Sequence, residues 1–145
     1  MSGPYRCETE IEVRYAETDQ MGVVHHSVYL VWFEVARTRL CLETGFHYAE
    51  VEALGYYLVV TRTETRYRAG VSYGESVRVA CWLDKLLSRG LRFGYEVCRG
   101  DEVVATGTTE HIWIEKATGR PCRIPEVVKD PFHRLFARER NPHSP

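Results

Sequence analysis

The chain of 145 residues lacks several features that mark other kinds of protein. It contains no block of lysines or arginines, and its formal net charge is -1 with both signs interspersed. Since nucleic-acid binding needs a concentrated basic surface, nucleic acid is not an expected partner. No apolar run approaches the roughly 20 residues that a membrane-spanning helix needs, so a membrane is not an expected partner either.

Cysteine is scarce and scattered. The five cysteines are an odd number, and none belongs to a C-x-x-C pair. Free, mostly buried thiols in a reducing compartment fit this pattern better than a disulfide framework or a zinc site. The segment MSGPYRCETE also lacks the apolar core of a signal peptide, so the cytoplasm is the expected location.

What the chain does contain is enough apolar sequence for one core. Hydrophobic residues make up 44% of the sequence, and there is no internal repeat, linker or low-complexity tract. This length suits one domain of ordinary size. We therefore expect a single domain over residues 1–145, with disorder in the last few residues, NPHSP.

A long apolar segment after residue 27 has the spacing of a helix. Ser27 can cap a helix that begins at Val28, and the segment VYLVWFEVARTRLCLETG is apolar nearly all round in its first turns. A helix of that kind is enveloped by other elements rather than laid on a surface. We expect Gly45 to end it and a short second helix to cover residues 47–54.

Strand patterns lie on both sides of this helix in the sequence. Residues 8–16 alternate, with Ile11, Val13 and Tyr15 on one face, as in a half-buried strand. Beyond residue 55, segments rich in β-branched and aromatic residues predict four consecutive antiparallel strands, at 56–68, 75–87, 91–100 and 102–116. The tail predicts one or two short helices from Pro125. Such a sheet must curl around the apolar helix to bury both, which predicts an α+β fold.

The junction of strand and helix carries the residues that suggest chemistry. The segment TDQMGVVHHSVYLVWFEVARTRL resembles the signature of hotdog-fold acyl-CoA thioesterases of the 4-hydroxybenzoyl-CoA thioesterase type. That signature reads roughly D-x-x-G-V-V-[YFH]-[HY]-x-x-Y, followed by a helix with an aromatic-Glu/Asp-x-x-Arg feature. The matching residues are Asp19, Gly22, Val23, Val24, His25, His26 and Tyr29, then Phe33, Glu34 and Arg37.

The resemblance continues over nearly the whole chain. The segment TRYRAGVSYGESVRV is similar to the family's strand-turn-strand segment, and GLRFGYEVCRGDEVVATGTTEHIWIEKATGRPCRIP is similar to its last hairpin. Departures are Thr65 or Arg66 in place of Asp, Gly70 and Val71 in place of a proline region, and Glu75 in place of Asp. We expect these departures to affect a turn and not the chemistry. The implied fold is a long central helix wrapped by a curved, mainly antiparallel five-stranded sheet.

The implied activity is hydrolysis of an acyl-CoA thioester to free acid and CoA. Asp19 would act as nucleophile or as general base on water, and the sequence does not decide between these. The N–H groups of His26 and Ser27, at the positive end of the helix, would be unpaired donors that polarise the thioester carbonyl. Gly22 would permit the sharp turn, and the His26 side chain is a second candidate catalytic group.

These residues also have structural interpretations. The segment TDQMG is good turn chemistry, so Asp19 can serve only to start a turn. A lone histidine is more often structural than catalytic, and this interpretation is favoured for His25 and kept open for His26. Glu34 and Arg37 are three residues apart, so we expect them to pair at the helix surface or at a subunit contact.

The segment SRG between two predicted strands is the expected CoA site. In the family that the sequence resembles, basic and hydroxyl residues in this region often bind the CoA phosphates. Ser88 and Arg89 are the candidates, with Lys85 behind them, because the planar fork of arginine binds phosphate in a bidentate manner. The alternative is a solvated hairpin turn.

Other functions on this fold remain open. A hotdog acyl-CoA hydratase or dehydratase usually needs a different Asp/His pair, and a non-catalytic acyl-CoA sensor is argued against only by the presence of Asp19. A metal hydrolase using His25, His26 and His111 is disfavoured, because adjacent histidines should point apart and no H-E-x-x-H spacing appears. No metal and no cofactor are expected.

The resemblance also implies a homo-oligomer. A curved sheet leaves an open edge that needs cover. Subunits of this family pair edge to edge, commonly into a homotetramer of two dimers with active sites at the dimer interface. The sequence does not tell a dimer from a tetramer, CoA from an acyl-carrier protein as the leaving group, or one acyl chain from another.

Overall fold

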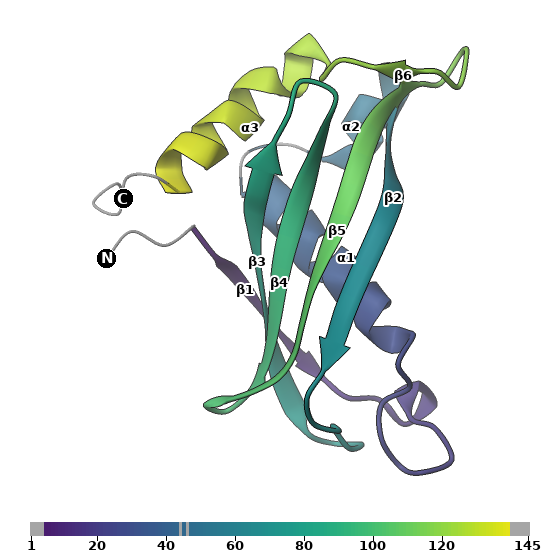
Figure 1. Ribbon diagram of the computed structural model, residues 1–145, viewed down its shortest axis with the longest axis vertical. Coiled ribbons are helices and arrows are strands. Elements are labelled where there is room, and N and C mark those ends of the chain that lie inside the picture. Colours follow the sequence, from purple (N-terminus) through teal and green to yellow (C-terminus); the bar gives the residue numbers. More distant parts are fainter. Residues whose placement is uncertain (1–4, 44, 46, 140–145) are drawn as a thin grey trace.

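A curved sheet surrounds one side of a central helix in the computed structural model, which describes residues 5–43, 45 and 47–139 (Figure 1). The α+β class predicted from the sequence is confirmed. In chain order the elements are β1 (Cys7–Glu12), the 3-10 helix η1 (Tyr15–Glu17), α1 (Val28–Leu42), α2 (Tyr48–Ala53), β2 (Tyr56–Tyr67), β3 (Ser76–Leu86), β4 (Gly90–Arg99), β5 (Glu102–Glu115), β6 (Pro121–Cys122) and α3 (Glu126–Glu139).

The strand order is β1-β3-β4-β5-β2, and every neighbouring pair is antiparallel. The four strands from β2 to β5 agree with the predicted segments to within one or two residues. The predicted number of five strands is one too few, because the two-residue strand β6 also pairs with β5. Among the described residues, β2 pairs with β5 alone, so its other edge is open.

The first strand is shorter than predicted. The alternation over residues 8–16 continues in the sequence, but β1 ends at Glu12 and the chain turns into η1. The carboxylate of Glu17 accepts the backbone N–H of Arg14 at 2.8 Å, which folds the backbone back before a strand can continue. Tyr15 is therefore 77% exposed, and its predicted place on the buried face is wrong.

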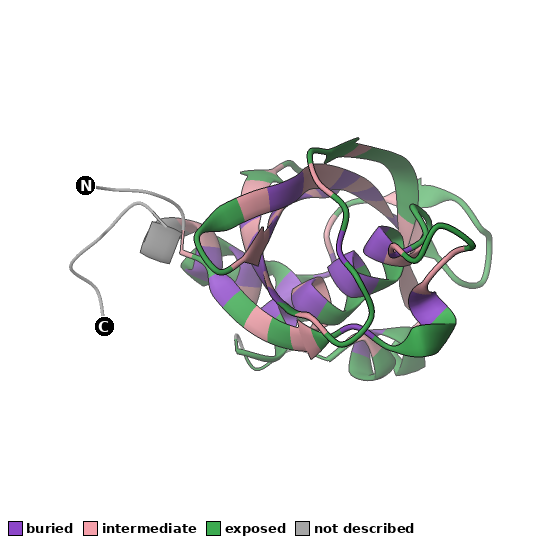
Figure 2. Ribbon diagram, turned by 90° about the horizontal axis from the view of Figure 1, so that it is seen from below, coloured by how far each residue is buried: buried purple, intermediate pink, exposed green. Residues whose placement is uncertain are grey.

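The central helix buries the side that faces the sheet, as the end-on view shows (Figure 2). Phe33 stacks on Tyr95 of β4 with ring centroids 4.2 Å apart. A Cβ at position 107 of β5 would lie 2.6 Å from the Phe33 ring, so Gly107 is what allows this close packing. The opposite side of the helix is not covered by the described residues, since Val31 and Val35 are about half exposed. The prediction of a fully enveloped helix is wrong for the chain by itself.

A buried polar chain crosses the core between helix and sheet. The hydroxyl groups of Tyr95 and Thr109 lie 2.6 Å apart, and Thr109 Oγ1 is 2.8 Å from Nε2 of His111. The expected pair of Arg37 and Glu34 is present, with their side chains 3.7 Å apart; Glu34 is exposed, whereas the Arg37 side chain is mostly buried against Tyr95. Burial, with Arg37 acting in the same direction, lowers the pKa of His111 to about 3.

The C-terminal segment forms one helix, α3, directly after Pro125. Its Val128, Phe132 and Leu135 are buried against the core, with Phe132 edge-on to Trp113. The predicted disorder of NPHSP falls outside the described residues. No helix in the described ranges is long and apolar enough to cross a membrane.

Candidate active site

Residues 18–27, which join η1 to α1, form a compact loop at one end of the sheet (Figure 1). The backbone N–H of Asp19 donates to the carbonyl of Val23 at 2.7 Å, and that of Gly22 donates to the carbonyl of Asp19 at 3.0 Å. Gly22 has a φ of 84°, a left-handed conformation that glycine adopts readily. The sharp turn predicted at Gly22 is present.

The Asp19 carboxylate both orders this loop and keeps one oxygen available. Its Oδ1 accepts the backbone N–H of Met21 at 2.9 Å and that of Val23 at 3.4 Å. No donor among the described residues bonds to Oδ2, and the residue is only half-buried. The turn interpretation and the chemical interpretation of Asp19 are therefore compatible.

The loop is held against the segment that follows β2. Val23 forms an isolated bridge with Ser72, and the N–H of Val24 donates to the carbonyl of Val71 at 2.8 Å. At Gly70 a Cβ would lie 3.0 Å from Cγ1 of Val23. The departures at Gly70 and Val71 thus lie beside the loop that carries Asp19, and the expectation that they do not affect the chemistry stays a prediction.

Glu17 anchors the loop through buried contacts, and it was not identified from the sequence as a site residue. Its side chain is 6% exposed and accepts the Arg14 guanidinium at 3.1 Å and the indole N–H of Trp32 at 3.2 Å. Its carbonyl accepts the N–H of His25 at 2.9 Å. Burial alone would raise the pKa of this carboxyl, but the donors of Arg14 and Trp32 outweigh it and hold the pKa below its usual value.

Of the two backbone N–H groups predicted for the oxyanion site, at His26 and Ser27, one is available in the described part of the chain. We expected the N–H of Ser27 to be unpaired, and this is wrong, because it donates to Nδ1 of His25 at 3.2 Å. The Ser27 hydroxyl lies 2.8 Å from the same nitrogen and makes no capping bond to the helix. Among the described residues, none accepts the N–H of His26. The N–H of His26 therefore stays a candidate for the predicted oxyanion role, whereas that of Ser27 does not.

The two histidines lie side by side on the surface. The rings of His25 and His26 are stacked, with centroids 4.3 Å apart, so the expectation that they point apart is wrong. The reason is that residues 25–27 form a turn, in which the N–H of Val28 donates to the carbonyl of His25. No group of three His, Cys, Asp or Glu side chains in the described part of the chain is arranged to hold a metal ion.

The residues predicted for CoA gather in a cleft of about 440 Å³ at the β3–β4 hairpin. Lys85, Ser88 and Arg89 all line it, and Thr61, Arg92 and Glu110 complete its polar wall. Gly90 forms part of its floor, where a Cβ would lie 2.4 Å from the carbonyl oxygen of His111.

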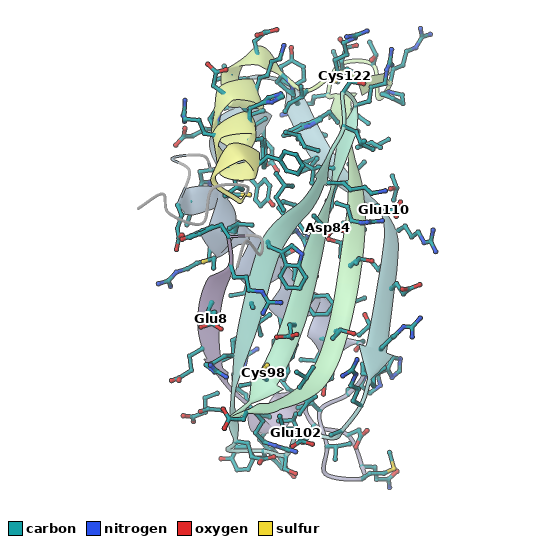
Figure 3. The ribbon with its side chains drawn as sticks, turned by 60° about the vertical axis from the view of Figure 1, so that its left-hand side comes forward. Glu8, Asp84, Cys98, Glu102, Glu110 and Cys122 are labelled. Carbon is teal, nitrogen blue, oxygen red and sulfur yellow. The ribbon has the colours of Figure 1, made fainter. Side chains whose placement is uncertain are left out.

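Charge in this cleft is mixed. Arg92 is paired with Asp84 at 2.6 Å, whereas no salt bridge among the described residues involves Lys85 or Arg89. Asp84 and Glu110 lie toward the hairpin end of the sheet (Figure 3). The cleft therefore presents two exposed cations and hydroxyl groups, which suits a phosphate.

The structure does not bring the two groups of predicted residues together within one chain. Tyr67, which contacts the Asp19 loop, pairs with Ala105, whereas Gly90 of the cleft pairs with Ile112 on the same strand. At about 3.3 Å per residue, these positions are roughly 20 Å apart along β5. Asp19, Gly22, His26 and Ser27 share one end of the sheet, and the cleft lies toward the other.

Comparisons with known proteins identify the family and the fold. The family described as the thioesterase-like superfamily matches residues 13–132. The protein YneP of Bacillus subtilis is 37% identical over 122 residues, which cover 83% of this chain and 88% of YneP. The structure of the DHNA-CoA thioesterase of Staphylococcus aureus is similar with a TM-score of 0.84 and 36% identity, covering 92% of this chain and 89% of that one.

A third likeness has the highest identity of the three. The structure of the protein TT1821 of Thermus thermophilus is 42% identical, with a TM-score of 0.85, and the match covers 90% of this chain and 98% of that one. The resemblance seen in the segment TDQMGVVHHSVY is thereby confirmed. The chain belongs to the thioesterase-like superfamily, and it is an enzyme that hydrolyses thioesters on a hotdog fold.

Proposed function

We propose that the enzyme hydrolyses an acyl-CoA to the free acid and CoA, with the thioester carbonyl bound between Asp19 and the N–H of His26. One observation carries this proposal. The loop fixes Asp19 through Oδ1 and leaves Oδ2 available. The same loop ends at the N-terminus of α1, where the His26 N–H has no acceptor among the described residues. The name of the similar Staphylococcus aureus enzyme, a DHNA-CoA thioesterase, supports a CoA substrate.

Two reaction routes fit this arrangement. In the first, an oxygen of Asp19 attacks the carbonyl carbon, the C–S bond breaks, CoA leaves as the thiolate, and water then cleaves the resulting anhydride. In the second, Asp19 removes a proton from water, the water oxygen attacks, and the thiolate leaves and takes up the proton. In both, the His26 N–H and the positive end of α1 stabilise the developing oxyanion.

The distance between the Asp19 loop and the cleft supports a site shared between two copies of the chain. The open edge of β2 is suited to pairing with another strand. If two copies pair antiparallel along β2 about a two-fold axis, the Tyr67 end of one chain lies beside the Tyr56 end of the other. Asp19 of one copy would then approach the cleft with Arg89 of its partner copy.

We therefore propose a homodimer as the minimal active unit, with a tetramer of two dimers as the larger assembly. Light scattering at micromolar concentration checks whether the protein is at least a dimer. A fully active monomer would contradict the shared site.

The five cysteines of the protein are free thiols, which suits a reducing compartment. We therefore propose the cytoplasm as the location of the enzyme.

The decisive experiment compares the wild type with Asp19→Asn. Free thiol release is followed from acetyl-, hexanoyl-, palmitoyl-, benzoyl- and phenylacetyl-CoA. Loss of a positioned carboxylate should lower kcat by a factor on the order of 10² to 10⁴. Asp101→Asn, in the exposed β4–β5 turn, is the matched control and should keep full activity.

The outcomes separate the possible functions. Rapid hydrolysis of one acyl class by the wild type, lost in Asp19→Asn but retained in Asp101→Asn, supports the proposal and identifies the acyl group. A wild-type protein that binds CoA but hydrolyses none of the five thioesters would overturn it.

A further inference from the structure

The turn at the start of α1 has nearly all its backbone polar groups paired. The His25 N–H donates to Glu17, the His25 carbonyl accepts from Val28, and the Ser27 carbonyl accepts from Leu30. The Ser27 N–H donates to the ring of His25. Among the described residues, only the His26 N–H in this three-residue turn has no partner.

The remaining group of the turn, the carbonyl of His26, is held from a distant strand. The hydroxyl of Tyr67, the last residue of β2, donates to it at 2.8 Å. The Tyr67 ring also packs edge-on against Tyr29 in the first turn of α1, with centroids 5.1 Å apart. Tyr67 is thus braced against the same helix whose N-terminus it bonds.

The bond from Tyr67 to the His26 carbonyl restrains the direction of the His26 N–H, because peptide units are planar. The His26 carbonyl and the Ser27 N–H belong to one planar unit, which Tyr67 holds at one end and the His25 ring at the other. The His26 N–H belongs to the preceding planar unit, whose carbonyl is bonded to Val28. Since the two units meet at the Cα of His26, fixing both of them fixes the direction of that N–H.

From this geometry we infer that Tyr67 is a positioning residue, which holds the His26–Ser27 peptide so that the His26 N–H points at the substrate carbonyl. The inference rests on the proposed function and extends it. A donor that is fixed before the reaction stabilises an oxyanion better than one that must reorient during it. Tyr67 contributes to the rate through His26 and not through a bond to the reacting atoms.

The test is Tyr67→Phe, which removes only the hydroxyl and keeps the ring against Tyr29. Removing an oxyanion donor lowers kcat by about 10² to 10³, so loosening one should lower it by about tenfold with KM changed less than about twofold. Tyr73→Phe is the matched control, because Tyr73 lies outside β2 and is 63% exposed, with its ring edge-on to Tyr15. Its kcat should equal that of the wild type.

A spectroscopic measurement separates positioning from simple loss of structure. The best substrate of the panel is prepared with a ¹³C-labelled carbonyl and bound to Asp19→Asn and to Asp19→Asn/Tyr67→Phe. A hydrogen bond from His26 lowers the C=O stretching frequency of the bound thioester, and infrared difference spectra should show a smaller shift in the double variant. Thermal unfolding of Tyr67→Phe should match that of Tyr73→Phe.

The results distinguish failure of this inference from failure of the proposed function. If the wild type hydrolyses an acyl-CoA but Tyr67→Phe keeps its kcat, the function stands and the positioning role is overturned. A lowered kcat with an unchanged carbonyl shift also overturns it, because the hydroxyl then acts elsewhere. If the wild type hydrolyses no acyl-CoA, both the function and the positioning role are wrong.

Discussion

The two ends of the sheet differ in how their polar groups are paired. At the end that carries Asp19, hydrogen bonds within the chain hold most backbone N–H groups of the loop. At the hairpin end, Lys85 and Arg89 line an open cleft and take part in no salt bridge with another described residue. The first arrangement suits chemistry, which needs fixed groups. The second suits recognition of a charged ligand that enters and leaves.

This contrast predicts that changes to the buried groups that anchor the Asp19 loop act on stability and kcat together, whereas changes to the exposed cations of the hairpin end act on KM. The strongest way to break the ordered end without touching Asp19 is Glu17→Ala. The carboxylate of Glu17 joins Arg14 to Trp32, and its removal leaves a buried indole N–H without its acceptor.

For Glu17→Ala we expect the free energy of unfolding in urea at pH 7 to fall by about 3 kcal/mol, with a large loss of kcat. Because the folded pKa of Glu17 is lowered, its contribution is complete above the ordinary carboxyl pKa and is lost as the pH falls through the folded value. Glu10→Ala, on the exposed side of β1, is the control. Equal stability of the two variants would show that Glu17 is not an anchor.

A second effect should come from His111, which lies beneath the hairpin-end cleft. Its pKa is lowered from 6.5 to about 3, so the unfolded chain binds a proton at this residue at pH values where the folded chain does not. Stability should therefore fall by up to about 1.4 kcal/mol per pH unit as the pH drops from about 6.5 toward 3.

Urea unfolding of the wild type and of His111→Gln at several pH values between 7 and 4 checks this expectation. The variant is less stable at pH 7 if the bond to Thr109 matters, but its stability should depend less on pH than that of the wild type. Parallel pH profiles for the two proteins would mean that His111 is not buried in its neutral form.

The smallest effect is expected at the exposed cations. Arg89→Ala should raise KM for an acyl-CoA about tenfold with little change in kcat, because a charge-assisted bond to phosphate would be lost. Arg120→Ala, in the exposed turn before β6, should change neither constant. Added salt should raise the KM of the wild type more than that of Arg89→Ala.

Mixing the variants Asp19→Asn and Arg89→Ala tests whether the two ends of the sheet act together across two copies of the chain. If each site takes Asp19 from one copy and Arg89 from the other, a mixed dimer of Asp19→Asn and Arg89→Ala contains one site with both wild-type residues. Co-refolding of the two variants should then recover activity at low substrate concentration. If no activity is recovered, both residues act within one chain or Arg89 does not bind substrate.

Local sequence patterns sufficed for much of the fold. The strands β2 to β5 and the helix α1 were predictable because β-branched alternation and a glycine-bounded apolar run are features of neighbouring residues. The same holds for Asp19 and Gly22, which share a turn within four residues of chain. Lys85, Ser88 and Arg89 share a cleft for the same reason.

The missed features depend on contacts that a linear pattern does not contain. Tyr67 reaches His26 across 41 residues, and this contact follows from the pairing of β2 with β5 and from the curvature of the sheet. Glu17 is a surface residue by composition, and only the position of Trp32 on the inner side of α1 makes it a buried anchor. The pairing of Ser27 with His25 depends on the conformation of a single turn.

The bond between Trp32 and Glu17 also gives the enzyme an optical reporter. Indole emission depends on the charges and hydrogen bonds around the ring, and the Trp32 N–H points at a carboxylate that supports the Asp19 loop. Trp82 and Trp113 lie on β3 and β5, so replacing both with phenylalanine would leave Trp32 as the single emitter. Its fluorescence would then report any change around the Glu17 carboxylate, such as its protonation or substrate binding to the loop it supports, without any added label.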